Sequence, residues 1–205
     1  MLIRRRQTST TRVLVFALIM VSAAVSGCAT AYTEGRTALT LGRYEEAATD
    51  FEHALTEHPD RIDALVGLGV ARYKLGAFDE SIETLSRAVA KAPKSQTAQL
   101  YLGLSHFQKD DLGPAEEHLK AVVDLHPGAR MAEQIERALT LMRGDPLSAA
   151  VRAFIAASLE HEAEWARDLQ DARYAAAAYA YSGPRYGYYG LGRCFMARRG
   201  RAVCF

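Results

Sequence analysis

Three cysteines, Cys28, Cys194 and Cys204, are the residues of this chain whose side chains could most readily do chemistry. A thiol can carry an acyl chain, form a disulfide or bind a metal, and the surrounding sequence indicates which. Residues 1–12 hold four Arg and no acid, and residues 13–25 form an apolar run. That run is shorter than the roughly 20 apolar residues that a membrane-spanning helix needs. A basic segment, a short apolar run and small residues behind it predict an export signal that ends just before Cys28.

The residues that close this segment, Val25, Ser26, Gly27 and Cys28, resemble a bacterial lipobox. The resemblance implies that Cys28 becomes the first mature residue and carries lipid, which would anchor the protein in a bilayer. Ala29, rather than Asp, follows the cysteine, and in enterobacterial lipoproteins this implies the outer membrane, facing the periplasm. The alternatives are an ordinary signal peptide that is cut nearby and an uncleaved anchor.

Cys194 and Cys204 lie in a tail rich in Gly, Tyr and Arg. In an exported protein an even pair of thiols favours a disulfide, which here would close a loop of about ten residues. The alternative is a disordered tail with two free thiols. Residues 172–205 hold six Arg and no acid. This composition is similar to that of nucleic-acid-binding tails, but the export signal argues against a nucleic acid as partner.

The remaining residues show no pattern typical of catalysis. None of the six histidines forms an HExxH or another paired metal spacing, and no GxSxG, phosphate-binding loop or dinucleotide-binding glycine pattern is present. We therefore expect no enzyme activity, no cofactor and no metal site. The histidines are His53, His58, His106, His118, His126 and His161.

The elements that would position any binding residue follow an internal repeat. Small residues recur where the first helix of each repeat must approach its neighbour closely, large apolar residues recur where they would fill the space between helices, and a proline recurs where the second helix must stop. The members of these series, spaced 34 apart, are Gly35, Gly69 and Gly103; Phe51, Leu85 and Leu119; Ala54, Ala88 and Val122; and Pro59, Pro93 and Pro127.

A 34-residue period with these residue types resembles the tetratricopeptide repeat. The resemblance implies an all-α helical solenoid of about three full repeats, then a degenerate fourth with a long capping helix and an irregular C-terminal tail. Asp110 departs from the pattern, because the first two repeats have Gly at this place. The expected segments are a signal peptide over 1–27, repeats over 28–61, 62–95 and 96–129, the degenerate repeat with the capping helix over 130–180, and the tail over 181–205.

In tetratricopeptide proteins the first helix of each repeat lines a concave groove. The matching positions here are largely apolar and aromatic, which suits an amphipathic helix as ligand. We expect that Tyr73→Ala with Phe107→Ala would abolish partner capture and leave the fold intact. The alternative is that the long C-terminal helix fills the groove itself. The expected groove residues are Tyr32, Arg36, Val66, Val70, Tyr73, Lys74, Leu100, Leu104, Phe107 and Gln108.

These features together predict a lipid-anchored adaptor or scaffold of the bacterial cell envelope that holds a protein partner, either a peptide or a helix. The alternative is a structural protein that self-associates or contacts the cell wall through its tail. Charge supports a tail with a separate role: residues 28–171 hold 15 Lys and Arg against 24 Asp and Glu, whereas the charged side chains of residues 172–205 are all basic.

Overall fold

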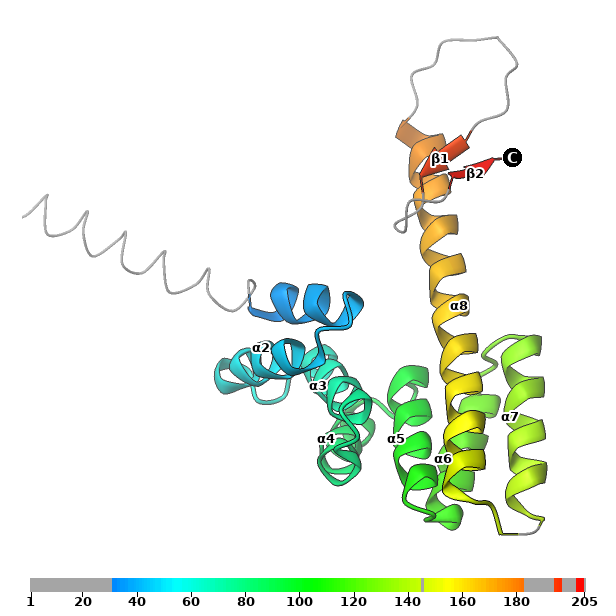
Figure 1. Ribbon diagram of the computed structural model, residues 1–205. Coiled ribbons are helices and arrows are strands. Elements are labelled where there is room, and N and C mark those ends of the chain that lie inside the picture. Colours follow the sequence, from blue (N-terminus) through cyan, green and yellow to red (C-terminus); the bar gives the residue numbers. More distant parts are fainter. Residues whose placement is uncertain (1–30, 145, 183–193, 197–201, 205) are drawn as a thin grey trace, which may run out of the picture. The chain divides into compact units, whose positions relative to one another are not determined.

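The computed structural model describes residues 31–144, 146–182, 194–196 and 202–204 (Figure 1). Apart from two short strands, these residues form helices that run in consecutive pairs. The chain divides into two compact units, one ending at Ala156 and one beginning at Ala157. The elements are a helical segment over 31–40, α2 (Tyr44–Glu57), α3 (Ile62–Lys74), α4 (Phe78–Lys91), α5 (Gln96–Gln108), α6 (Leu112–Asp124), α7 (Ala129–Met142), α8 (Ala149–Ser182), β1 (Cys194–Met196) and β2 (Ala202–Cys204).

The turn inside each of the first three pairs has one geometry. Gly42, Gly76 and Asp110, spaced 34 apart, all have a positive φ, between 67° and 76°. In each turn the following residue donates a backbone hydrogen bond of 2.9 Å to a carbonyl five residues earlier, which closes the first helix. Asp is among the few residues besides Gly that adopt this left-handed conformation. Asp110 therefore forms the same turn as the two glycines.

The core confirms the predicted pairing of small with large residues. Phe51, Leu85 and Leu119 are completely buried. A Cβ atom added to Gly69 would lie 2.4 Å from Leu85 Cγ, and one added to Gly103 would lie 3.1 Å from Leu119 Cγ. The first helix of a repeat therefore packs directly on a large side chain of the second helix. Each helix from α2 to α7 packs on the next one, and α3 also packs on α5, so the repeats form one continuous core.

The helices end where the prolines predict. α2 ends at Glu57 and α4 at Lys91, each two residues before a proline, and α6 ends at Asp124, three residues before Pro127. Proline cannot donate the hydrogen bond that would continue a helix, and it disfavours the helical conformation in the residue before it. This recurrent stop allows the next helix to turn back on the stack.

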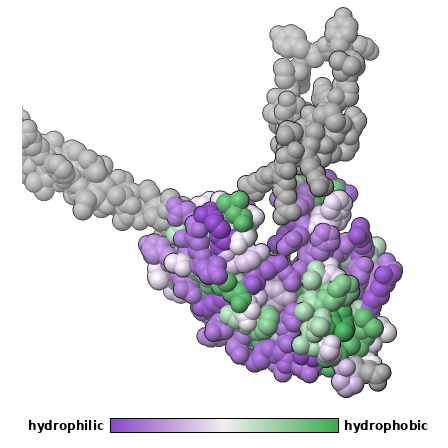
Figure 2. All heavy atoms as spheres, in the orientation of Figure 1, coloured by the Kyte–Doolittle hydropathy of each residue, from purple (hydrophilic) through white to green (hydrophobic). Residues whose placement is uncertain are grey.

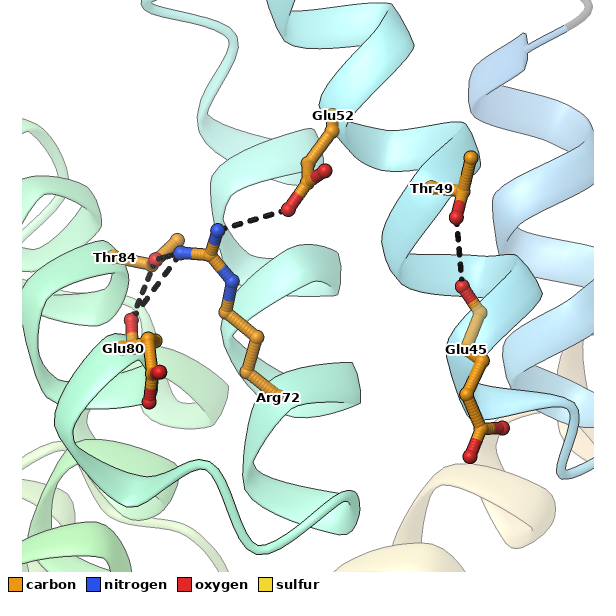
Figure 3. A network of polar contacts seen from close by, with 6 residues as sticks. All are labelled: Glu45, Thr49, Glu52, Arg72, Glu80 and Thr84. Carbon is orange, nitrogen blue, oxygen red and sulfur yellow. Dashed lines mark hydrogen bonds and ion pairs between the residues drawn. The ribbon is translucent and has the colours of Figure 1, made fainter.

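One arginine joins three successive helices of the first two repeats (Figure 3). The Arg72 guanidinium, on α3, donates one hydrogen bond to Thr84 Oγ1 on α4 at 2.5 Å and another to Glu52 Oε1 on α2 at 2.9 Å. Glu52 lies 20 residues from Arg72, so this contact links the first repeat to the second. The Arg72 side chain is only partly exposed, which strengthens these bonds relative to those of a solvated arginine.

After α7 the chain continues into α8, the segment for which the sequence predicts a degenerate repeat with a long last helix. Residues 149–156, the first two turns of α8, belong to the first unit, and Ile155 and Ala156 are buried. Arg152 of this segment forms an ion pair of 3.0 Å with Asp110, in the turn between α5 and α6. In the second unit, α8 continues to Ser182.

The part of the tail that the structure describes, residues 194–196 and 202–204, forms two short strands. β1 and β2 pair antiparallel, with Cys194 opposite Cys204, Phe195 opposite Val203 and Met196 opposite Ala202. Two short apolar segments on either side of a basic stretch can form such a pair. Cys28 and the predicted export signal lie outside the described residues. Within the described part of the chain, no helix combines the length and the apolar character needed to cross a membrane.

Candidate partner-binding surface

The structure divides the ten expected groove residues into two equal groups. Arg36 is exposed, and Tyr32, Val66, Lys74 and Gln108 are partly exposed, so these five side chains keep a surface that a partner can reach. The other five are buried. The reachable part of the expected groove is therefore more polar and cationic than the sequence suggests, and most of its aromatic and aliphatic part belongs to the core. The buried five are Val70, Tyr73, Leu100, Leu104 and Phe107.

Tyr32 is the centre of a polar cluster on the reachable side. The Arg61 guanidinium lies 3.8 Å from the centroid of the Tyr32 ring, and the Arg36 guanidinium lies 5.9 Å from it. Burial raises the pKa of the Tyr32 hydroxyl, and the negative charge of Asp63, to which the hydroxyl is hydrogen bonded, raises it further. Arg61 also approaches Asp63 at 3.7 Å. This cluster joins the helical segment 31–40 to α3 and leaves Arg36 at the surface.

Tyr73 has a structural position instead of an open one. Its ring packs edge-on against Tyr101 of α5, with centroids 5.3 Å apart, and against Phe78 of α4, with centroids 5.6 Å apart. Aromatic pairs in this geometry contribute beyond their buried area. Phe107 is fully buried as well. The expectation that Tyr73→Ala with Phe107→Ala leaves the fold intact is therefore corrected, because the double substitution removes two rings from the core.

A second, hydrophobic surface lies on α7 and the start of α8. Figure 2 shows hydrophobic side chains gathered over α7 and the start of α8, on a face of the solenoid that is otherwise mainly hydrophilic. Leu141 of α7 is 51% exposed and Phe154 of α8 is 74% exposed, with Val151 also exposed. Val151 and Phe154 have the helical spacing of core residues, so only the placement of the helices shows that they face outward.

Two histidines lie together between α5 and α6. The rings of His106 and His118 are stacked, with centroids 5.9 Å apart and an interplanar angle of 17°. His118 Nδ1 is hydrogen bonded to Gln99 Oε1 at 2.8 Å, and His106 Nδ1 lies 3.5 Å from Asp111 Oδ2. Burial lowers the pKa of His118; Glu117 opposes this shift and His106 adds to it. Over the residues that the structure describes, no group of three or more His, Cys, Asp or Glu side chains is placed to hold a metal ion.

Comparison with known proteins identifies the repeat. The family model "Tetratricopeptide repeat" matches residues 32–96 and 72–130. Among curated proteins, "Protein CTR9 homolog" from Arabidopsis thaliana is 28% identical over 95 residues, which make up 46% of this chain and 9% of that much longer protein. The matched stretch therefore supports the repeat itself, and the rest of that protein has no counterpart in the alignment.

Solved structures support the same fold. The type III secretion translocator chaperone SycD of Yersinia enterocolitica superposes with a TM-score of 0.52 at 18% identity, over 57% of this chain and 91% of SycD. A structure titled "MamA RS-1 ArsTM double mutant" gives 0.54 at 25% identity, over 66% and 76%. The TPR2B domain of yeast Sti1, in a complex with a pHsp70 ligand, gives 0.50 at 19% identity, over 56% and 94%.

Fold, repeat and comparisons define the class. Residues 32–130 match the tetratricopeptide repeat and form an all-α solenoid in which one helix pair recurs in each repeat. Tetratricopeptide domains are protein–protein interaction modules and are typically not enzymes. The candidate functional surface is therefore a docking surface for a protein.

Proposed function

We propose that this protein is a lipid-anchored adaptor or scaffold of the bacterial cell envelope, which holds a partner peptide or helix on the concave side of its repeats. The observation that carries the proposal is the stack of repeats with Arg36, Val66, Lys74 and Gln108 at reachable positions of successive first helices. Such an array presents side chains from separate repeats along one partner segment. Solenoids use extended surfaces of this kind for binding.

The chemistry of this surface indicates which class of partner segment it fits. Its reachable end has the cation of Arg36 beside the Tyr32 ring, and Val66 adds an apolar contact on α3. A partner segment that offers an apolar side chain to Val66 and a hydrogen-bond acceptor or an acid to Arg36 would satisfy both residues. One solved structure of similar fold, the first repeat domain of Spaghetti (RPAP3), is bound to an HSP90 peptide. That ligand is a property of the relative, and the partner of this chain is to be found by experiment.

The first test of the docking surface reverses one exposed charge. Arg36→Glu should abolish crosslinking of the partner in intact cells, because it replaces the exposed cation while leaving the core unchanged. Lys94→Glu is a matched control, since Lys94 is exposed in the loop between α4 and α5, outside the expected groove. Equal capture by both variants would contradict the placement of the docking surface. The folded state of each variant is checked by its helical circular dichroism and its melting temperature.

The membrane anchor is proposed from the lipobox-like residues that end at Cys28. Cys28→Ser should move the protein from the membrane fraction to the soluble fraction of the envelope, because an acylated cysteine would then be absent. Metabolic labelling with a fatty acid reports the same event independently. A wild-type protein that takes up no label, or a Cys28→Ser protein that stays in membranes, would contradict a lipid anchor at Cys28. Separation of inner from outer membranes tests the predicted location.

A further inference from the structure

In the second unit, the side chains of α8 that the structure describes between Trp165 and Ala177 form no packed face. From Trp165 to Ala177 every side chain is exposed except Ala172 and Ala176, which are partly buried. Trp165 is 53% exposed and Leu169 is 42% exposed. Helices in water gain most of their stability from packing an apolar face, and an isolated helical segment of this length is marginal. This segment therefore needs a partner surface.

Four apolar residues of the segment form one stripe. Trp165, Leu169, Ala172 and Ala176 are spaced four, three and four residues apart, the alternating spacing of residues that face another helix in a coiled coil. The stripe is uneven in size. Its first half holds the two large side chains and its second half holds two methyl groups. A partner that fits this stripe must be small where the stripe is large, and large where it is small.

We propose that α8 pairs antiparallel with α8 of a second copy of this chain, with Trp165 against Ala176 and Leu169 against Ala172. A two-fold axis that passes between residues 170 and 171 brings these positions opposite each other, and each contact then occurs twice. A parallel pair would instead put Trp165 against Trp165 and Ala176 against Ala176. The helices would then be too far apart at one end and too close at the other.

Charge favours the same direction. Residues 160–171 hold five Asp and Glu with one Arg, whereas residues 172–205 hold six Arg and no acid. The antiparallel register places the end of α8, at Ser182, beside residue 159 of the other copy. The basic chain that follows Ser182 then starts next to the acidic segment of its partner. A parallel pair would bring the two acidic segments together, and like charges side by side disfavour association.

The test exchanges large and small residues across the expected contact. Light scattering coupled to size-exclusion chromatography of the full chain in detergent should show twice the protein mass of one chain. Trp165→Ala leaves small residues opposite each other, and Ala176→Trp puts large ones opposite each other. Each single variant should raise the dissociation constant of the dimer at least about tenfold. The double variant, Trp165→Ala with Ala176→Trp, restores large against small and should recover the dimer.

Mixing the two single variants separates this contact from an intramolecular one. In a mixed pair each small residue meets a large one, so an equimolar mixture should form the dimer that neither variant forms alone. Leu141→Ala, which removes an equally exposed leucine from α7, should keep the wild-type mass. A monomeric wild type, single variants with full dimer, or a mixture that stays monomeric would each overturn the proposal. The last result would indicate that the stripe is covered by the same chain or by a different protein.

Discussion

Two equivalent joints of the solenoid hold the same helices together with different chemistry. Arg72 and Thr84 join α3 to α4, and His106 and His118, each one repeat further on, occupy the same places on α5 and α6. The first joint is a permanent cation bonded to Thr84 and to Glu52 of the preceding repeat. The second is a stack of two imidazoles held by Gln99. The fold thus tolerates a charged joint and a titratable joint at one repeat position.

The difference arises from a residue far away in the sequence. The position that Glu52 occupies in the first repeat is occupied by Ser86 in the second. An arginine at position 106 would therefore lack the carboxylate of the preceding repeat that Arg72 has, and the carboxylate shown next to position 106 is that of Asp111, in the turn of its own repeat. The two joints share one feature. In both repeats a small residue of the first helix packs on a large residue of the second helix. We expect the largest losses of stability from substitutions in this shared packing and smaller losses from substitutions in the joints themselves.

The largest effect is expected from the shared core. Leu85→Ala and Leu119→Ala should each lower the free energy of unfolding by about 2–5 kcal/mol, because each removes a fully buried side chain and leaves a cavity. Chemical denaturation monitored by circular dichroism measures both. Similar losses would show that the two joints rest on the same core. A loss under about 1 kcal/mol for either variant would show that this leucine is not part of it.

A methyl group added at each of the two equivalent glycines should destabilise the two repeats to different extents. Gly69→Ala should cost about 1–3 kcal/mol, since its Cβ would meet Leu85 at 2.4 Å and the buried neighbour must move. Gly103→Ala should cost less, since its Cβ would lie 3.1 Å from Leu119. The two variants are compared in the same denaturation experiment. The opposite order would mean that the third repeat is packed more tightly than the second.

The charged joint should matter more than an exposed ion pair. Arg72→Met should lower the free energy of unfolding by about 1–2 kcal/mol, because it removes a charged hydrogen bond to each of two neighbouring helices. Arg43→Met is the control: it removes a close but solvated pair with Glu46, and exposed pairs contribute at most about 1 kcal/mol. Equal losses of unfolding free energy in the two variants would show that the charged joint contributes no more than an exposed ion pair.

The titratable joint should make stability depend on pH. The pKa of His118 is lower in the folded chain than in the unfolded chain, so the unfolded chain binds more protons between the two values. The free energy of unfolding should therefore fall as the pH drops below about 6.5, with a slope from this group of at most about 1.4 kcal/mol per pH unit. Melting curves between pH 7.5 and 5 measure the effect.

A variant that copies the charged joint into the next repeat tests whether the pH dependence of stability arises from the two histidines. The triple variant Ser86→Glu, His106→Arg and His118→Thr copies the joint of the preceding repeat. It should lose part of the acid sensitivity, because no imidazole is left between α5 and α6. Other histidines and carboxylates titrate in both proteins, so the difference between the two curves isolates the pair. Identical pH profiles would show that the His106–His118 stack does not contribute to the pH dependence of stability.

Much of the fold could be predicted because it depends on residues close in the sequence or equally spaced. The repeat period predicted the helix pairs, the prolines predicted their ends, and the small residues at 69 and 103 predicted close packing on Leu85 and Leu119. Asp110 shows the limit of residue types as signals. It departs from the glycine pattern, yet its backbone takes the same left-handed turn.

The candidate site was predicted less well. All ten groove positions belong to first helices, but periodicity alone does not separate a side chain that faces a partner from one that faces the next repeat. Tyr73 is buried because Tyr101 and Phe78 pack on it from two other helices. The exposed surface of Phe154 was not predicted for the same reason, since its helical spacing is that of core residues.

The sequence by itself determined the repeat, the glycine turns of the first two repeats and the pairs of small and large residues, because these depend on backbone conformation and on spacing within one repeat. Tertiary structure alone decided which apolar residues stay open and which charges meet. Contacts such as Arg72 with Glu52, or Arg143 with Glu116, join residues 20 and 27 positions apart in different repeats. Their partners depend on how one repeat is rotated on the next, and that rotation results from the packing of the whole stack.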